Sequence, residues 1–191
     1  MILVHGIGVH PNWPDVIYPL RDALLRHEVT SLSVQMPVLA NDADSLDYAP
    51  LFDEVASRLD AAIVYLKEAG YKNIAIVSHS MGSSMVAHYL SGDYLQPISS
   101  WVAIGMGPGI ANTSVDNLAA LESISLPILD LYGSVDLEQV LASAEQRAAA
   151  AQKQEGHSYR QIKVEGANHF FQGSEAALGR EVLQWLDRYA E

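Results

Sequence analysis

Short apolar segments rich in β-branched residues recur along the chain, and polar stretches containing Gly, Pro, Asn or Ser separate them. Their length, composition and boundaries predict β-strands rather than helices. Most of them are apolar almost throughout, which is typical of a strand covered on both faces of a sheet. The predicted strands are residues 2–4, 32–36, 74–77, 101–104, 128–132 and 160–164.

Between these segments, apolar residues return every three or four positions, which predicts amphipathic helices. Asn12, followed by Pro14, predicts the start of the first helix, and Gly70 predicts the end of the second. Strands that alternate with helices form parallel sheets with helices on both faces, because a parallel pair needs a crossover connection. The apolar helix positions are Ile17, Leu20 and Leu24; Phe52, Val55, Leu59, Ile63 and Leu66; Met85 and Tyr89; Leu137, Leu141, Ala144, Ala148 and Ala151; and Leu178, Val182, Trp185 and Tyr189.

Two longer connections, residues 37–50 and 105–127, are rich in Asp, Asn, Gly or Pro and are predicted to be loops with little regular structure. Loops at the carboxyl ends of parallel strands usually line the ligand site of such a sheet.

Composition and net charge restrict the number of domains, the partners and the chemistry that are expected. A chain of 191 residues, 49% of them hydrophobic, is long enough for a full core and is expected to form a single domain over residues 1–191. The net charge of −12 argues against nucleic acid or an anionic membrane as a partner. The absence of cysteine excludes disulfides and thiolate chemistry. The oligomeric state does not follow from these features.

No apolar stretch approaches the roughly 20 residues that span a bilayer, so no transmembrane helix is expected. The chain opens on the apolar residues 1–4 without a basic segment and a long apolar one, so no signal peptide is visible. A cytoplasmic location is the default expectation, and a periplasmic or secreted one stays open if the chain was trimmed.

The segment Ser78-His79-Ser80-Met81-Gly82 directly follows a predicted strand and precedes a helix-compatible stretch. A serine exposed on such a tight turn is accessible to a base and lies beside a helix N-terminus, which activates it as a nucleophile. The usual pattern has Gly two residues before the serine, and Ser78 departs from it. Alternatively, Ser80 is simply a helix N-cap.

The first predicted strand ends in His5-Gly6-Ile7-Gly8. Acyl transfer requires two backbone N–H donors directed at the developing oxyanion, one from the residue after the nucleophile and one from a loop after an earlier strand. Met81 and Ile7 occupy those positions. A Gly-rich strand exit or a phosphate cradle are the alternatives, but no phosphate-binding Gly motif or lysine accompanies it.

A base for Ser80 is expected after a late strand, because the chain order in this arrangement is Ser, then Asp or Glu, then His. His169 follows the last predicted strand, whereas His157 precedes it. Asp136 follows the strand 128–132 and is predicted to orient His169. Asp130 lies in mid-strand, Glu138 and Asp116 are weaker substitutes, and Asp136 could instead cap a helix.

No spacing typical of metal ligands is present, so neither a metal nor another cofactor is expected. The remaining histidines are predicted to be surface, packing or supporting residues: His5, His10, His27, His79 and His88.

On the motifs at His5–Gly8 and His79–Gly82 the chain resembles the α/β-hydrolase superfamily, most closely its small, lid-less bacterial lipases and carboxylesterases. Residues 10–39 also resemble an uncharacterised bacterial group of hydrolase-like proteins. The resemblance implies a compact α/β-hydrolase fold with about six mainly parallel strands and no cap domain. It also implies a nucleophile, base, acid and two oxyanion donors at the positions already derived from strand context: Ser80, His169, Asp136, Ile7 and Met81.

These features together predict a serine hydrolase that cleaves short to medium acyl esters of small molecules through an acyl-enzyme on Ser80. A catalytically weak or inactive binding protein of the same fold, or a thioesterase or acyltransferase using the same residues, are the alternatives. An apolar acyl slot, if present, is expected from some of the following residues, each of which is equally well explained by packing: Trp13, Met36, Pro37, Met106 and Ile110.

Overall fold

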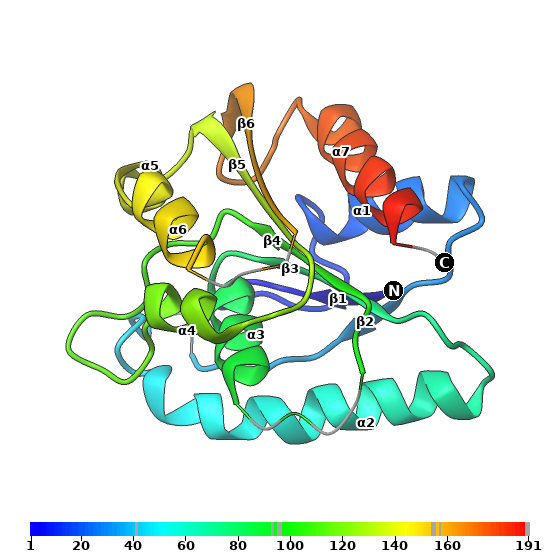
Figure 1. Ribbon diagram of the computed structural model, residues 1–191, viewed down its shortest axis with the longest axis horizontal. Helices are drawn as coiled ribbons and strands as arrows, with labels where there is room; N and C mark the ends of the chain where they lie inside the picture. The colour runs from blue at the N-terminus through cyan, green and yellow to red at the C-terminus, as the bar shows by residue number, and fades with distance from the viewer. Residues whose placement is uncertain (41, 93, 95–96, 154–155, 157, 190–191) are drawn as a thin grey trace.

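The computed structural model describes residues 1–40, 42–92, 94, 97–153, 156 and 158–189. Six strands form one sheet in the order β2-β1-β3-β4-β5-β6, and every neighbouring pair is parallel (Figure 1). The six predicted strands are all present, with ends that shift by up to four residues. Their bounds are β1 Ile2–Val4, β2 Leu32–Val34, β3 Ala75–His79, β4 Ser100–Ile104, β5 Ile128–Val135 and β6 Tyr159–Asn168.

Helices cover both faces of this sheet, as predicted. α1 (Ile17–Arg26) and α7 (Glu175–Arg188) pack side by side on one face, and α2 (Val55–Glu68), α3 (Met81–Ser91) and α4 (Asn117–Ser123) lie on the other (Figure 1). The arrangement is that of the α/β-hydrolase fold, and in the described part of the chain no separate cap covers the carboxyl ends of the strands. The 3-10 helix η1 (Ala49–Glu54) leads into α2.

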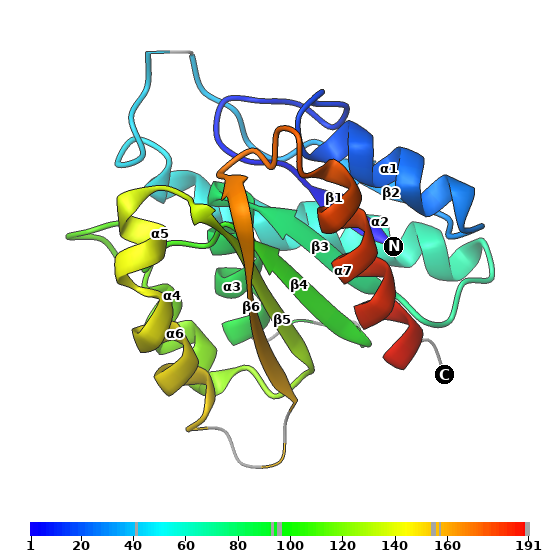
Figure 2. The same cartoon turned by 90° about the horizontal axis from the view of Figure 1, so that it is seen from above.

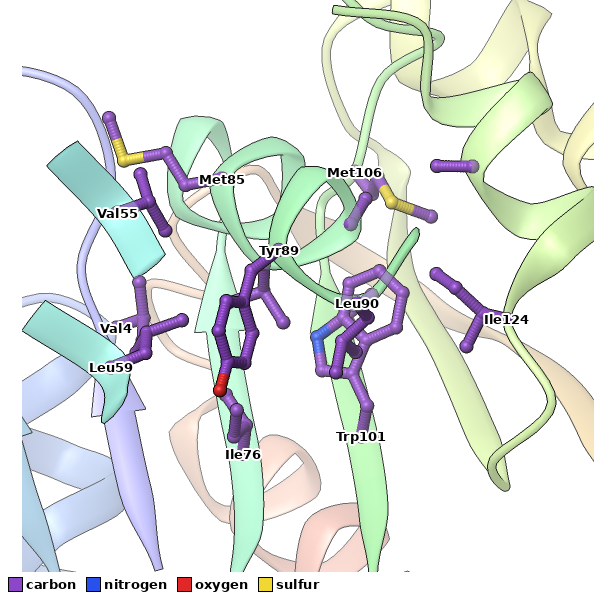
Figure 3. Packing of buried hydrophobic residues seen from close by; sticks show 14 of the residues in the cluster. Val4, Val55, Leu59, Ile76, Met85, Tyr89, Leu90, Trp101, Met106 and Ile124 are labelled. Atoms are coloured by element: carbon purple, nitrogen blue, oxygen red, sulfur yellow. The ribbon is translucent and has the colours of Figure 1, made fainter. Parts of the chain in front are cut away.

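The alternation of side chains along each strand divides the apolar residues between two cores. Ile76 and Trp101 point toward α2, α3 and α4, where they meet Tyr89 and Leu90 (Figure 3). Val77 and Val102 point to the opposite face and pack against α1 and α7. The inner strands β1, β3, β4 and β5 are therefore buried on both sides, which explains why their sequences are mostly apolar, whereas the edge strands β2 and β6 are only partly buried.

Three local predictions are corrected. The segment 105–127 is not only loop, because Asp116 accepts hydrogen bonds from the N–H groups of Leu118 and Ala119 and so begins the short helix α4. Asn12 does not cap a helix: α1 begins at Ile17, and the Asn12 side chain accepts a hydrogen bond from Arg21.

The predicted helix over 137–151 is two helices, α5 (Glu138–Ala142) and α6 (Ala144–Ala151), which meet at Ser143 (Figure 2). The prediction at Gly70 is confirmed: it follows the end of α2 with φ of 92°, a conformation that glycine adopts without strain. Within the described residues, none of the helices is both long and apolar enough to cross a bilayer.

Candidate active site

Ser80 occupies a sharp turn between β3 and α3. Its φ of 56° and ψ of −124° are outside the regions that a serine normally adopts, so the turn is strained. The Ser80 N–H donates to the carbonyl of Ile104 at 2.8 Å, which ties the turn to the end of β4. Gly82 is required here, because a Cβ at this position would lie 2.3 Å from the carbonyl oxygen of His5.

Ser78, which departs from the usual glycine, is buried beneath this turn. Its hydroxyl oxygen accepts a hydrogen bond from the indole N–H of Trp101 at 2.8 Å. The same hydroxyl lies 3.1 Å from Ser83 Oγ, and Ser83 in turn donates to the carbonyl of Ile104 at 3.2 Å. The extra side chain thus joins β3, β4 and α3 under Ser80 instead of obstructing the turn.

The loops after β5 and β6 bring Asp136 and His169 to the same edge of the sheet as Ser80. His169 Nε2 lies 2.9 Å from Ser80 Oγ, and His169 Nδ1 lies 2.6 Å from Asp136 Oδ1. The three side chains therefore form one continuous chain of hydrogen bonds. The Asp136 side chain is fully buried and that of His169 nearly so.

The protonation states follow from the surroundings. Burial by itself raises the pKa of Asp136, but the hydrogen bond and charge of His169 and the N–H groups of Gly133 and Leu137 together hold that pKa below its ordinary value. Asp136 is therefore a carboxylate and accepts a hydrogen bond from the N–H group at His169 Nδ1. That tautomer leaves His169 Nε2 as an acceptor for the Ser80 hydroxyl.

Two neighbours hold His169 in place. Gly105, with φ of 58°, lies directly against the imidazole: a Cβ there would be 3.0 Å from both Cε1 and Nδ1 of His169. His79 Nε2 lies 2.9 Å from the carbonyl oxygen of His169. Burial and, to a smaller extent, the proximity of His169 lower the pKa of His79 to about 4, so its ring is neutral at pH 7.

A small hollow of about 160 Å³ opens beside Ser80. Ile7 and Met81, the two residues predicted to supply oxyanion donors, both border it. The loop carrying Ile7 is braced by His5, whose Nδ1 donates to the carbonyl of Gly6 at 2.8 Å while its Nε2 accepts from the N–H of Met36 at 3.0 Å. A groove of about 580 Å³ adjoins the hollow and shares four lining residues with it: Ser45, Gly109, Ile110 and Gln139.

Comparison with known proteins places the chain in a family. Residues 48–188 match the model of a family described as "Protein of unknown function (DUF3530)". The chain belongs to this DUF3530 family. No curated protein matches the sequence.

Solved structures resemble this DUF3530 chain over nearly its whole length. MenH from S. aureus shares 14% identity with a TM-score of 0.74 and covers 100% of this chain and 94% of its own. Dienelactone hydrolase from Anabaena variabilis shares 21% identity with a TM-score of 0.73, and the match covers 98% of this chain and 85% of the hydrolase. Est1E from Butyrivibrio proteoclasticus shares 13% identity with a TM-score of 0.69, and the match covers 99% of this chain and 87% of Est1E. At these identities the likeness establishes the α/β-hydrolase fold.

The alternative acids of the DUF3530 chain have other roles. Asp130 is fully buried and binds Arg147 Nε at 2.7 Å, and it also accepts a hydrogen bond from Tyr159 at 2.8 Å. Asp116 caps α4, and Glu138 is exposed in α5. The alternative base, His157, lies outside the described residues.

The remaining histidines and apolar candidates are distributed as follows. His10 and His27 are exposed, and His88 packs edge-on against Phe52. Of the residues expected to line an acyl slot, Ile110 borders the hollow, whereas Met36 and Met106 are buried in the core.

The sequence did not indicate several residues of the site. Ser84, Gln139 and Val140 border the hollow, and Gly105 supports His169. Only Ser84 had a local signal, since it lies four residues after Ser80 and therefore on the same side of the predicted helix. The larger hollow between α1 and α7, about 580 Å³, contains none of the predicted site residues.

Proposed function

We propose that this protein is a serine hydrolase that cleaves esters of short to medium acyl groups through an acyl-enzyme on Ser80. The observation that carries the proposal is the hydrogen-bonded series from Ser80 Oγ to His169 Nε2, at 2.9 Å, and from His169 Nδ1 to Asp136 Oδ1, at 2.6 Å. A nucleophile, a base and a group that orients the base are the parts that acyl transfer requires.

In the proposed reaction, Ser80 Oγ forms a bond to the ester carbonyl carbon as His169 Nε2 takes its proton. The N–H groups of Ile7 and Met81 stabilise the oxyanion of the tetrahedral intermediate. The bond to the alcohol oxygen then breaks, and that oxygen receives the proton from His169. Water attacks the acyl-enzyme by the same steps, with His169 as base again, and releases the acid.

The carboxylate of Asp136 supports these reaction steps, because it stabilises the imidazolium that forms on His169 and fixes the ring orientation. Among proteins of the same fold, a Rhodothermus marinus protein has an esterase domain, and the Anabaena variabilis protein is a dienelactone hydrolase. Ester cleavage is therefore the reaction class that we assign to the site of this chain.

The test uses a fluorophosphonate probe and p-nitrophenyl butyrate. The wild-type protein should be labelled and should release p-nitrophenol, and Ser80→Ala should lose both while its unfolding curve stays close to wild type. Ser91→Ala, at the exposed end of the same helix, is the matched control and should retain both. Turnover by Ser80→Ala at the wild-type rate would contradict the assignment. A folded wild type without labelling would favour a binding protein instead.

A further inference from the structure

Ser84 is a buried polar residue in the wall of the hollow beside Ser80. It lies one helical turn after Ser80, and its N–H approaches the Ser80 carbonyl at 3.4 Å. Its relative exposure is 7%, and it borders the hollow together with the apolar side chains of Ile110 and Val140. A pocket for a plain alkyl chain has no need of this hydroxyl.

The direction of the hydrogen bond to Ser84 is fixed by Asn117. Asn117 Nδ2 lies 2.8 Å from Ser84 Oγ and 2.9 Å from the carbonyl oxygen of Gly107. A carbonyl oxygen only accepts, so the Asn117 atom is the amide nitrogen, and its two hydrogens go to Gly107 and Ser84. Ser84 Oγ is therefore an acceptor in this contact, and its own hydrogen is directed elsewhere.

That hydrogen has no acceptor within the described residues. A helical serine commonly donates to the carbonyl four residues earlier, but the Ser84 hydroxyl makes no such bond with Ser80. The Ser84 oxygen already accepts a hydrogen bond from Asn117, so the hydrogen of its hydroxyl is available to a group in the hollow. An occupant with an acceptor atom at this point would satisfy a buried donor, whereas a methylene group would not.

The position of Ser84 limits where the acceptor atom of that occupant lies. Ser80 and Ser84 both border this hollow of about 160 Å³. Ser80 directly precedes α3 and Ser84 lies in its first turn, with the Ser84 N–H 3.4 Å from the carbonyl oxygen of Ser80. An acyl group bonded to Ser80 Oγ and directed into the hollow therefore meets the Ser84 hydroxyl close to its carbonyl carbon.

We propose that Ser84 selects short acyl groups that carry a hydrogen-bond acceptor oxygen at the second or third position of the acyl chain. The proposal rests on the proposed ester hydrolysis at Ser80 and names the substrate class of that site. Ser84 donates to the acyl oxygen, and Asn117 positions the hydroxyl for this role.

The test compares p-nitrophenyl methoxyacetate with p-nitrophenyl butyrate, whose acyl groups have the same number of non-hydrogen atoms and differ by an ether oxygen in place of a methylene. The quantity is the ratio of kcat/KM for the first ester to that for the second. Ser84→Ala should lower this ratio by about 3- to 10-fold, the effect of one hydrogen bond. Ser91→Ala should leave it unchanged. Because both esters are measured on each variant, their different intrinsic reactivities cancel in the comparison.

Asn117→Asp provides a second variant that keeps the Ser84 oxygen. Its carboxylate accepts the Ser84 hydrogen, so the hydroxyl offers only lone pairs to the hollow and the ratio should again fall. If this variant does not fold, the Ser84→Ala ratio decides alone. A ratio for Ser84→Ala within twofold of the wild-type ratio would overturn the proposal about Ser84. The proposed ester hydrolysis would still stand in that case, provided that the proteins hydrolyse p-nitrophenyl butyrate. A wild type that neither turns over either ester nor reacts with fluorophosphonate would overturn both.

Discussion

His79 makes the folded state sensitive to acid. Its ring is buried, and Nε2 donates to the carbonyl oxygen of His169 at 2.9 Å, so the unprotonated Nδ1 lies against the backbone of Gly6. Protonation would add a charge and an N–H at a site without solvent. Burial first, and the neighbouring His169 second, accordingly lower the pKa of His79 to about 4 from 6.5.

The sign of the effect follows from which state binds the proton first. The unfolded chain protonates His79 near pH 6.5 and the folded chain only near pH 4, so the free energy of unfolding falls as the pH is lowered through this interval. The slope of about 1.4 kcal/mol per pH unit applies only below pH 6.5, so the loss between pH 7.5 and pH 4.5 is about 2.5 kcal/mol. Burial also lowers the pKa of His5, which adds to the loss. The lowered pKa of Asp136 acts only below pH 4, outside this interval.

The variant that isolates this contribution is His79→Gln, whose amide nitrogen donates to the His169 carbonyl but does not titrate. Urea unfolding at pH 7.5 and pH 4.5 gives the loss for each protein. We expect the wild type to lose about 2–3 kcal/mol more than the variant on acidification. The His5 contribution is common to both proteins and cancels. Losses that agree within about 0.5 kcal/mol would refute the reasoning, because they would mean that His79 takes up its proton equally in both states.

Three further predictions follow from the packing. Gly105→Ala should lower kcat for p-nitrophenyl butyrate by about 10-fold or more, because its Cβ would lie 3.0 Å from His169, whereas Gly70→Ala, also at positive φ but with open space around it, should cost only stability. Arg147→Met should lower the free energy of unfolding in urea by about 3–5 kcal/mol, because it leaves Asp130 buried and unpaired, and adding Asp130→Leu should restore much of it. Ser78→Gly should cost about 1–2 kcal/mol, and a double-mutant cycle with Trp101→Phe should assign most of this cost to their hydrogen bond.

The alternation of apolar segments was sufficient to predict the sheet and the positions of most helices, because the central strands are buried on both faces. It was insufficient for α4, which has only seven residues and begins at Asp116 within a stretch rich in Gly and Pro. Apolar spacing over about two helical turns is too short to recognise. The break at Ser143 between α5 and α6 also has no local signal: the buried Arg147 holds it by donating to the Ser143 hydroxyl and to the carbonyl of Val140.

The candidate site divides in the same way. Ser80, Asp136 and His169 each follow a strand, so the topology alone places them at one edge of the sheet, and the sequence could indicate their proximity. The contacts of Gly105 with His169, and of Asn117 with Ser84, join segments that no periodicity relates. They arise from how the loop after β4 and the start of α4 pack against α3 and His169, and they affect the orientation of His169 and the polarity of the hollow. Strand order therefore accounts for which residues meet, whereas the tertiary contacts of this loop account for what the site would accept.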